Sequence, residues 1–159
     1  MLPTRAVAVI IHNNTVLLME RMSTGKEYFT FPGGGVEDDE TVEQAVIREV
    51  KEETSLEVKI EKLIYKHFYN DNFKGRSNQY FYLCSYISGV PMLGEANEKE
   101  EMKLGKEFYK PQWMPVSQLS SLLLYPLEIK DWLIEDINNN FVNPPREATL
   151  SVKELRETL

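Results

Sequence analysis

Three glutamates lie close together in the hexapeptide REVKEE near the middle of the chain. On a helical wheel of about 100° per residue, with Glu49 at zero, Glu53 falls at about 40° and Glu52 at about 300°. Val42 and Val46 fall at about 20° and about 60°, so the acids continue the apolar stripe of the same helix. Carboxylates that point toward the protein body need a partner, and a hard divalent cation is the usual partner of several together. The pattern predicts a metal-binding cluster, and the alternative is a charged helix face in water.

A run of three glycines precedes this helix in the segment FPGGGVEDDE. Gly33, Gly34 and Gly35 would let backbone amides and carbonyls approach a ligand closely, and we expect them to lie outside regular structure. A glycine-rich loop that leads into a helix N-terminus can receive phosphate oxygens. A simple turn is the alternative for the glycines alone. The glycines, the helix and the aligned carboxylates together predict a site where phosphate groups meet metal ions.

The helix that must position the acids is predicted over residues 41–54. Thr41, with Gln44 three residues later, is typical of a capping box, and valines recur every four residues. Gln44, Arg48 and Lys51 fall away from the valine stripe, and we expect that face to be in solvent.

Apolar and β-branched runs on both sides of this helix predict strands, with short helices near the C-terminus. The order of strands, one central helix, strands and C-terminal helices indicates an α+β fold with a mixed sheet. The expected strands cover residues 5–11, 15–19, 28–31, 56–69, 78–87 and 112–116, and the expected helices begin at residues 117, 126 and 149.

The spacing of the glycine, arginine and acids resembles the box of the Nudix hydrolases, G-x5-E-x7-R-E-U-x-E-E-x-G-U, where U is a bulky aliphatic residue. The matching residues are Gly34, Glu40, Arg48, Glu49, Val50, Glu52, Glu53 and Leu56. Ser55 replaces the last glycine of the box, and we expect it to adopt a left-handed cap at a cost of about 1 kcal/mol. The resemblance implies a Nudix-type α/β/α sandwich with a mixed central sheet and a catalytic loop-helix-loop over residues 1–140, followed by a tail over 141–159 with a short helix.

The resemblance also implies roles for the residues of the box. Glu49, Glu52 and Glu53 would be the catalytic acids and the ligands of Mg²⁺ or Mn²⁺, with the backbone carbonyl of Gly34 as a further ligand. Arg48 would anchor the helix and a box glutamate, and Glu40 would support the loop and pair with Arg48. Many members use an acid from a distant loop, for which Glu98 is our choice in the segment GEANEKEE, where a solvated acidic loop is the alternative.

Such enzymes hydrolyse the pyrophosphate bond of a nucleoside diphosphate linked to another group, for example a nucleoside triphosphate such as an oxidised purine nucleotide. The glycine run would bind substrate together with Tyr28, Phe31 and Phe73 as aromatic platforms. Core packing is the alternative for these aromatic side chains. The alternative function is a catalytically silent sensor of nucleotides or nucleotide sugars that keeps the fold.

The composition and net charge of the chain limit the classes of molecule that it is expected to bind. The chain of 159 residues carries a net charge of −7, which disfavours a binder of duplex DNA or RNA. Its single cysteine, Cys84, allows no intrachain disulfide. The apolar run at residues 6–11 is too short to span a membrane. We therefore expect a cytoplasmic monomer or homodimer that acts on a small molecule.

Overall fold

The computed structural model describes residues 2–70, 75–93 and 108–151. Eight strands form one mixed sheet whose main order is β3-β2-β1-β6-β5-β8, with β4 also paired to β1 and β7 paired to β2. The strands are β1 (Thr4–His12), β2 (Thr15–Ser23), β3 (Lys26–Thr30), β4 (Gly33–Gly35), β5 (Glu57–Tyr69), β6 (Asn78–Ser88), β7 (Phe108–Pro115) and β8 (Arg146–Leu150). The pairs β1–β6 and β5–β8 are parallel, and the others are antiparallel.

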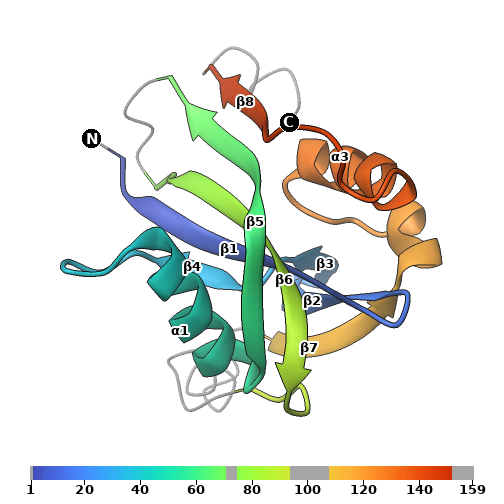
Figure 1. Ribbon diagram of the computed structural model, residues 1–159. Helices are drawn as coiled ribbons and strands as arrows, with labels where there is room; N and C mark the ends of the chain where they lie inside the picture. The colour runs from blue at the N-terminus through green and yellow to red at the C-terminus, as the bar shows by residue number, and fades with distance from the viewer. Residues whose placement is uncertain (1, 71–74, 94–107, 152–159) are drawn as a thin grey trace.

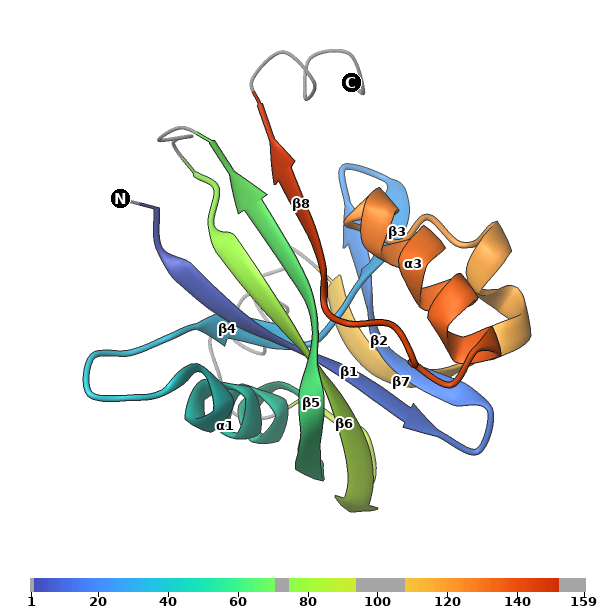
Figure 2. The same ribbon diagram turned by 45° about the horizontal axis from the view of Figure 1, so that its top comes forward.

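Helices cover both faces of this sheet (Figures 1 and 2). Helix α1 (Val42–Thr54) lies on one face, and helix α3 (Leu127–Asn138) lies on the other with the 3₁₀ helix η1 (Val116–Ser121). The arrangement confirms the expected α+β fold with a mixed central sheet between helices. In the described part of the chain, no helix is long and apolar enough to cross a membrane.

Strand β1 supplies both cores because successive side chains of a strand point to opposite faces. Ala6 and Ala8 pack with α1. Val7 and Val9 pack in the core that contains α3. Arg5 has the same parity as Val7, so its side chain belongs to the α3 face of the sheet.

Two expectations about local structure are wrong. The glycine run is strand β4, in which Gly33 pairs with Val7 and Gly35 pairs with Arg5. Its backbone groups find partners on β1, and a side chain on Gly33 would overlap the backbone of Ala6 and Val7. Strand β8 occupies residues 146–150 of the expected tail and pairs with β5, so Thr149 lies in a strand where a helix was expected. Residues 152–159 lie outside the described part of the chain.

Candidate active site

Helix α1 begins where the sequence predicts. Thr41 Oγ1 accepts from the Gln44 N–H at 3.1 Å, and the Gln44 side chain accepts from the Thr41 N–H at 2.9 Å, which completes the capping box. Ala45, Val46 and Val50 are fully buried against the sheet. This fixed face determines how the acids of the next turns are directed, and it turns them toward strand β4.

Glu49 packs directly on the glycine strand. A Cβ atom at Gly34 would overlap the Glu49 carboxylate, so only glycine leaves room for that group. The Glu49 side chain is 14% exposed and lies 2.7 Å from Arg48 Nη1. Burial raises the pKa of Glu49, and the neighbouring Arg48 opposes that rise. The result is a half-buried carboxylate that requires positive charge beside it.

The other two acids differ in their surroundings. Glu53 Oε2 accepts from the backbone N–H of Gly33 at 3.2 Å, which ties the last turn of α1 to β4. Glu52 is 48% exposed, and its Oε2 accepts from Arg48 Nη1 at 3.2 Å. The three acids therefore line the side of α1 that faces β4, and their exposure to solvent increases from the largely buried Glu49 to the half-exposed Glu52.

Arg48 holds this arrangement together, and its expected position in solvent is wrong. Its Nε and Nη2 donate to the two carboxylate oxygens of Glu40, each at 2.8 Å, as a bidentate pair. Nη2 also donates to the Gly35 carbonyl at 2.9 Å. The Arg48 bond lowers the pKa of Glu40 to about 2. On the wheel Arg48 is only about 40° from Glu52, so the acids draw it away from solvent.

The donor set fits a hard divalent cation. Carboxylate and carbonyl oxygens are the ligands that Mg²⁺ prefers, and Mg²⁺ commonly takes one or two carboxylates with the remainder from substrate phosphates and water. In the part of the chain that the structure describes, no three acidic, histidine or cysteine side chains stand close enough to share an ion. The largely buried Glu49 carboxylate against Gly34 and the Glu53 carboxylate on the next turn can supply the one or two carboxylates that Mg²⁺ commonly takes. Glu98 lies outside the described residues.

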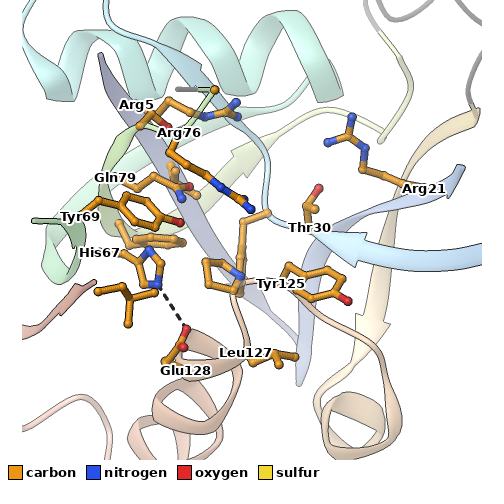
Figure 3. A pocket seen from close by; sticks show the side chains of 17 residues that line it. Arg5, Arg21, Thr30, His67, Tyr69, Arg76, Gln79, Tyr125, Leu127 and Glu128 are labelled. Atoms are coloured by element: carbon orange, nitrogen blue, oxygen red, sulfur yellow. Dashed lines mark hydrogen bonds and ion pairs between the residues drawn. The ribbon is translucent and has the colours of Figure 1, made fainter. Parts of the chain in front are cut away.

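A pocket of about 400 Å³ opens on the α3 face of the sheet, next to β4 (Figure 3). Arg5, Arg21 and Arg76 contribute guanidinium groups to it from separate parts of the chain. Its remaining lining is mainly aromatic and polar. Those residues are Val7, Thr30, Phe31, His67, Tyr69, Gly75, Ser77, Gln79, Phe81, Tyr125, Pro126, Leu127, Glu128 and Leu150.

Arg5 connects this pocket to the acids. Its Nη2 donates to the Gly33 carbonyl at 3.1 Å, while the Gly33 N–H bonds Glu53 on the other side. The Arg5 charge also favours the ionised form of Glu49. Arg5 Nε is buried without a hydrogen-bond partner among the described residues. The glycine strand thus separates a cationic pocket from the carboxylates by backbone alone.

The expected aromatic platforms are only partly at this pocket. Phe31 lines it, but it is largely core and meets Phe81 edge-on with ring centroids 5.7 Å apart. Tyr28 does not line it and instead contacts the guanidinium of Arg21, with its ring centroid 5.7 Å from Arg21 Cζ. Phe73 lies outside the described residues. Sequence reasoning missed Arg5 and Glu128, since neither stands in a motif.

Comparisons with known sequences find relatives that match part of this chain. The ADP-ribose pyrophosphatase of Methanocaldococcus jannaschii is 48% identical over 64 residues, which cover 39% of this chain and 38% of that protein. Nudix hydrolase 2 of Arabidopsis thaliana is 30% identical over 110 residues, which cover 67% of this chain and 36% of that protein. The matched regions therefore span little more than a third of these two relatives.

Solved structures match more of the chain. A NUDIX hydrolase from Nitrosomonas europaea superposes with a TM-score of 0.68 at 16% identity, over 95% of this chain and 78% of that one. An ADP-ribose pyrophosphatase from Streptococcus suis superposes with a TM-score of 0.65 at 19% identity, over 93% of this chain and all of that one. At these identities the similarity establishes the fold. The family model of the NUDIX domain matches residues 2–134, and the chain therefore belongs to the Nudix hydrolase family.

Proposed function

We propose that this protein hydrolyses the pyrophosphate bond of a nucleoside diphosphate linked to a further group, in a reaction that depends on Mg²⁺ or Mn²⁺. The observation that carries the proposal is the packing of the Glu49 carboxylate on Gly34, beside a pocket lined by three arginines. A phosphoanhydride brings several negative oxygens to one place, so its hydrolysis needs cations on one side and an activated water on the other. The arginines of the pocket would supply the cations, and a metal ion held by the glutamates of α1 would activate the water.

The metal would be held by Glu49 and Glu53, with the Gly34 carbonyl as a further ligand, and the exposed Glu52 side chain would have to turn toward it to add the third carboxylate of the expected set. Bound there, it would neutralise phosphate charge and lower the pKa of a coordinated water. The chain itself keeps the acids in place. Arg48 restrains Glu49 and Glu52 through hydrogen bonds of 2.7 and 3.2 Å, and the Gly33 N–H restrains Glu53. Preorganised ligands of this kind reduce the reorganisation needed during the reaction.

The pocket would take the nucleoside and the phosphates that are not attacked. The guanidinium groups of Arg5, Arg21 and Arg76 suit phosphate oxygens, because a planar fork of N–H donors matches them. Tyr69 and Tyr125 provide aromatic surface on the same pocket, and aromatic rings stack with any base. Arg5 would contact the phosphate nearest the acids, since it reaches Gly33.

The substrate class has several candidates. Relatives include proteins named ADP-ribose pyrophosphatase and, in Orientia tsutsugamushi at 25% identity over 126 residues, RNA pyrophosphohydrolase. A nucleoside triphosphate, including an oxidised purine nucleotide, fits the same requirement for a phosphoanhydride beside arginines.

The proposal is tested by incubating the purified protein with Mg²⁺ or Mn²⁺ and a panel of substrates, with products separated by chromatography. The panel contains canonical and oxidised nucleoside triphosphates, ADP-ribose, nucleotide sugars, dinucleoside polyphosphates and RNA with a 5′-triphosphate. We expect cleavage of one class, which EDTA abolishes and Mg²⁺ restores. Binding of the panel without cleavage under any metal would contradict the proposal and support a silent sensor. The presence of every charged residue of the box favours catalysis.

A further inference from the structure

The last turn of α1 is fastened to the connection that follows β6. The final carbonyls of a helix have no partner within the helix. Here the Thr54 carbonyl accepts from the Met92 N–H at 3.0 Å, and Ser55 Oγ donates to the Met92 carbonyl at 3.0 Å. Ser55 also continues the hydrogen bonding of the helix, because its N–H donates to the Lys51 carbonyl at 3.0 Å. Both backbone groups of Met92 are therefore bound at the end of α1.

The same connection approaches the end of α1 at a second point, Gly89. A Cβ atom on this residue would lie 2.8 Å from the Ser55 carbonyl oxygen and 3.1 Å from Leu56 Cα, so no larger residue fits without a shift of the backbone. The Tyr86 hydroxyl donates to the Gly89 carbonyl at 2.7 Å and holds it there. Close packing at residue 89 and two hydrogen bonds at residue 92 thus fix the connection against the helix.

Ser55 stands where the Nudix box has its last glycine. Glycine would adopt the left-handed φ of 65° found here without strain, whereas serine adopts it at a cost. Glycine has no hydroxyl, however, and could not donate to the Met92 carbonyl. The replacement therefore exchanges an unstrained backbone for a bond between α1 and the connection.

We propose that Ser55 is a positioning residue of the metal site, whose bond to Met92 keeps the last turn of α1 ordered for a divalent cation. The inference rests on the proposed function, because that function assigns the metal to the glutamates of this helix. Glu53 is two residues before Ser55 and accepts from the Gly33 N–H at 3.2 Å. Glu52, in the same turn, is 48% exposed. Helix ends fray, and a frayed turn must be ordered again when metal binds, which lowers the affinity.

Mn²⁺ binding, measured from the EPR signal of the free ion, tests this role without substrate. Ser55→Ala and Ser55→Gly both remove the hydroxyl, and each should weaken Mn²⁺ binding by about threefold to tenfold, the equivalent of one neutral hydrogen bond. The two variants differ in strain, because alanine is less stable than glycine at a left-handed position. A merely structural role would make Mn²⁺ affinity follow stability, with Ser55→Ala weaker than Ser55→Gly.

The control is Ser85→Ala, which removes a serine hydroxyl from β6 that donates to Glu61 at 2.7 Å. This variant should bind Mn²⁺ as the wild type does. A second measurement is the hydrogen exchange of the Met92 amide, followed by NMR. Coupling between two sites is reciprocal, so Mg²⁺ should slow this exchange in the wild type, and the slowing should be lost in Ser55→Ala.

Three results would overturn the inference and leave the proposed function intact. They are wild-type Mn²⁺ affinity in both Ser55 variants, affinities that follow the stabilities of the variants, and Met92 exchange that Mg²⁺ does not change in the wild type. A wild-type protein that binds no Mn²⁺ would instead refute the proposed metal site, and the inference with it.

Discussion

Replacing Gly34 by alanine places a methyl group where the Glu49 carboxylate now lies. The three atoms nearest to a Cβ at this position are the carboxylate carbon and both carboxylate oxygens of Glu49. Strand β4 is paired to β1, so the backbone cannot easily move away. Glu49 must therefore rotate out of its half-buried position. It would lose its hydrogen bond from Arg48, which keeps its bidentate bond to Glu40.

Two magnitudes follow. A methyl group forced into a packed site costs about 1–3 kcal/mol of unfolding free energy. Displacing a catalytic ligand by about an ångström costs on the order of 10²-fold in rate. Gly35→Ala serves as the control for stability, since a Cβ there meets no atom within 4 Å, and its unfolding free energy should stay within about 0.5 kcal/mol of wild type.

Urea unfolding of Gly34→Ala, Glu49→Ala and the double variant measures the coupling directly. If the Glu49 carboxylate is the obstacle, the cost of Gly34→Ala should fall close to that of Gly35→Ala once residue 49 is alanine. Hydrolysis of the substrate found in the panel gives the rate. Additive free energies in the cycle, or wild-type activity in Gly34→Ala, would refute the assigned packing of Glu49 on the glycine strand.

Three further changes test the supporting structure. Ser55→Gly should raise the unfolding free energy by up to about 1 kcal/mol in urea melts, since Ser55 is left-handed with φ of 65°, less what its hydrogen bond to Met92 contributes. Asp136→Ala should lower it by about 3 kcal/mol, because this carboxylate accepts from the buried Tyr65 hydroxyl and pairs with Arg146 at 2.8 Å. The pKa of Glu40 is lowered from 4.5 to about 2, so the contribution of its ionised form to the unfolding free energy is present above pH 4.5 and is lost as the pH falls toward 2. Glu40→Gln should therefore flatten the curve of unfolding free energy against pH in that range.

Helix α1 could be predicted from the sequence because its signals are local. The capping box at Thr41, the valine stripe and the left-handed Ser55 all depend on residues within a few positions of one another, and all three are confirmed. The glycine strand was missed because glycine has low strand propensity. Its pairing with β1 depends on the tertiary fold, which overrides that propensity.

The pocket could not be predicted in the same way. Arg5, His67 and Glu128 come from β1, β5 and α3, and only the sheet order brings these elements together. The position of Arg48 was misjudged for a related reason. A helical wheel places a side chain by angle alone, and a long arginine turns toward the acids that can pair with it.

The most direct test of the central claim compares Glu53→Gln with Glu57→Gln. Both variants remove one negative charge, but Glu53 faces the glycine strand, whereas Glu57 is exposed and pairs with Lys51 at 3.4 Å. The rate of phosphoanhydride hydrolysis under saturating Mg²⁺ should fall by at least about 10²-fold in Glu53→Gln and stay near wild type in Glu57→Gln, with both proteins folded. Equal activity in the two variants would contradict the assignment of the α1 glutamates as the metal-dependent catalytic site.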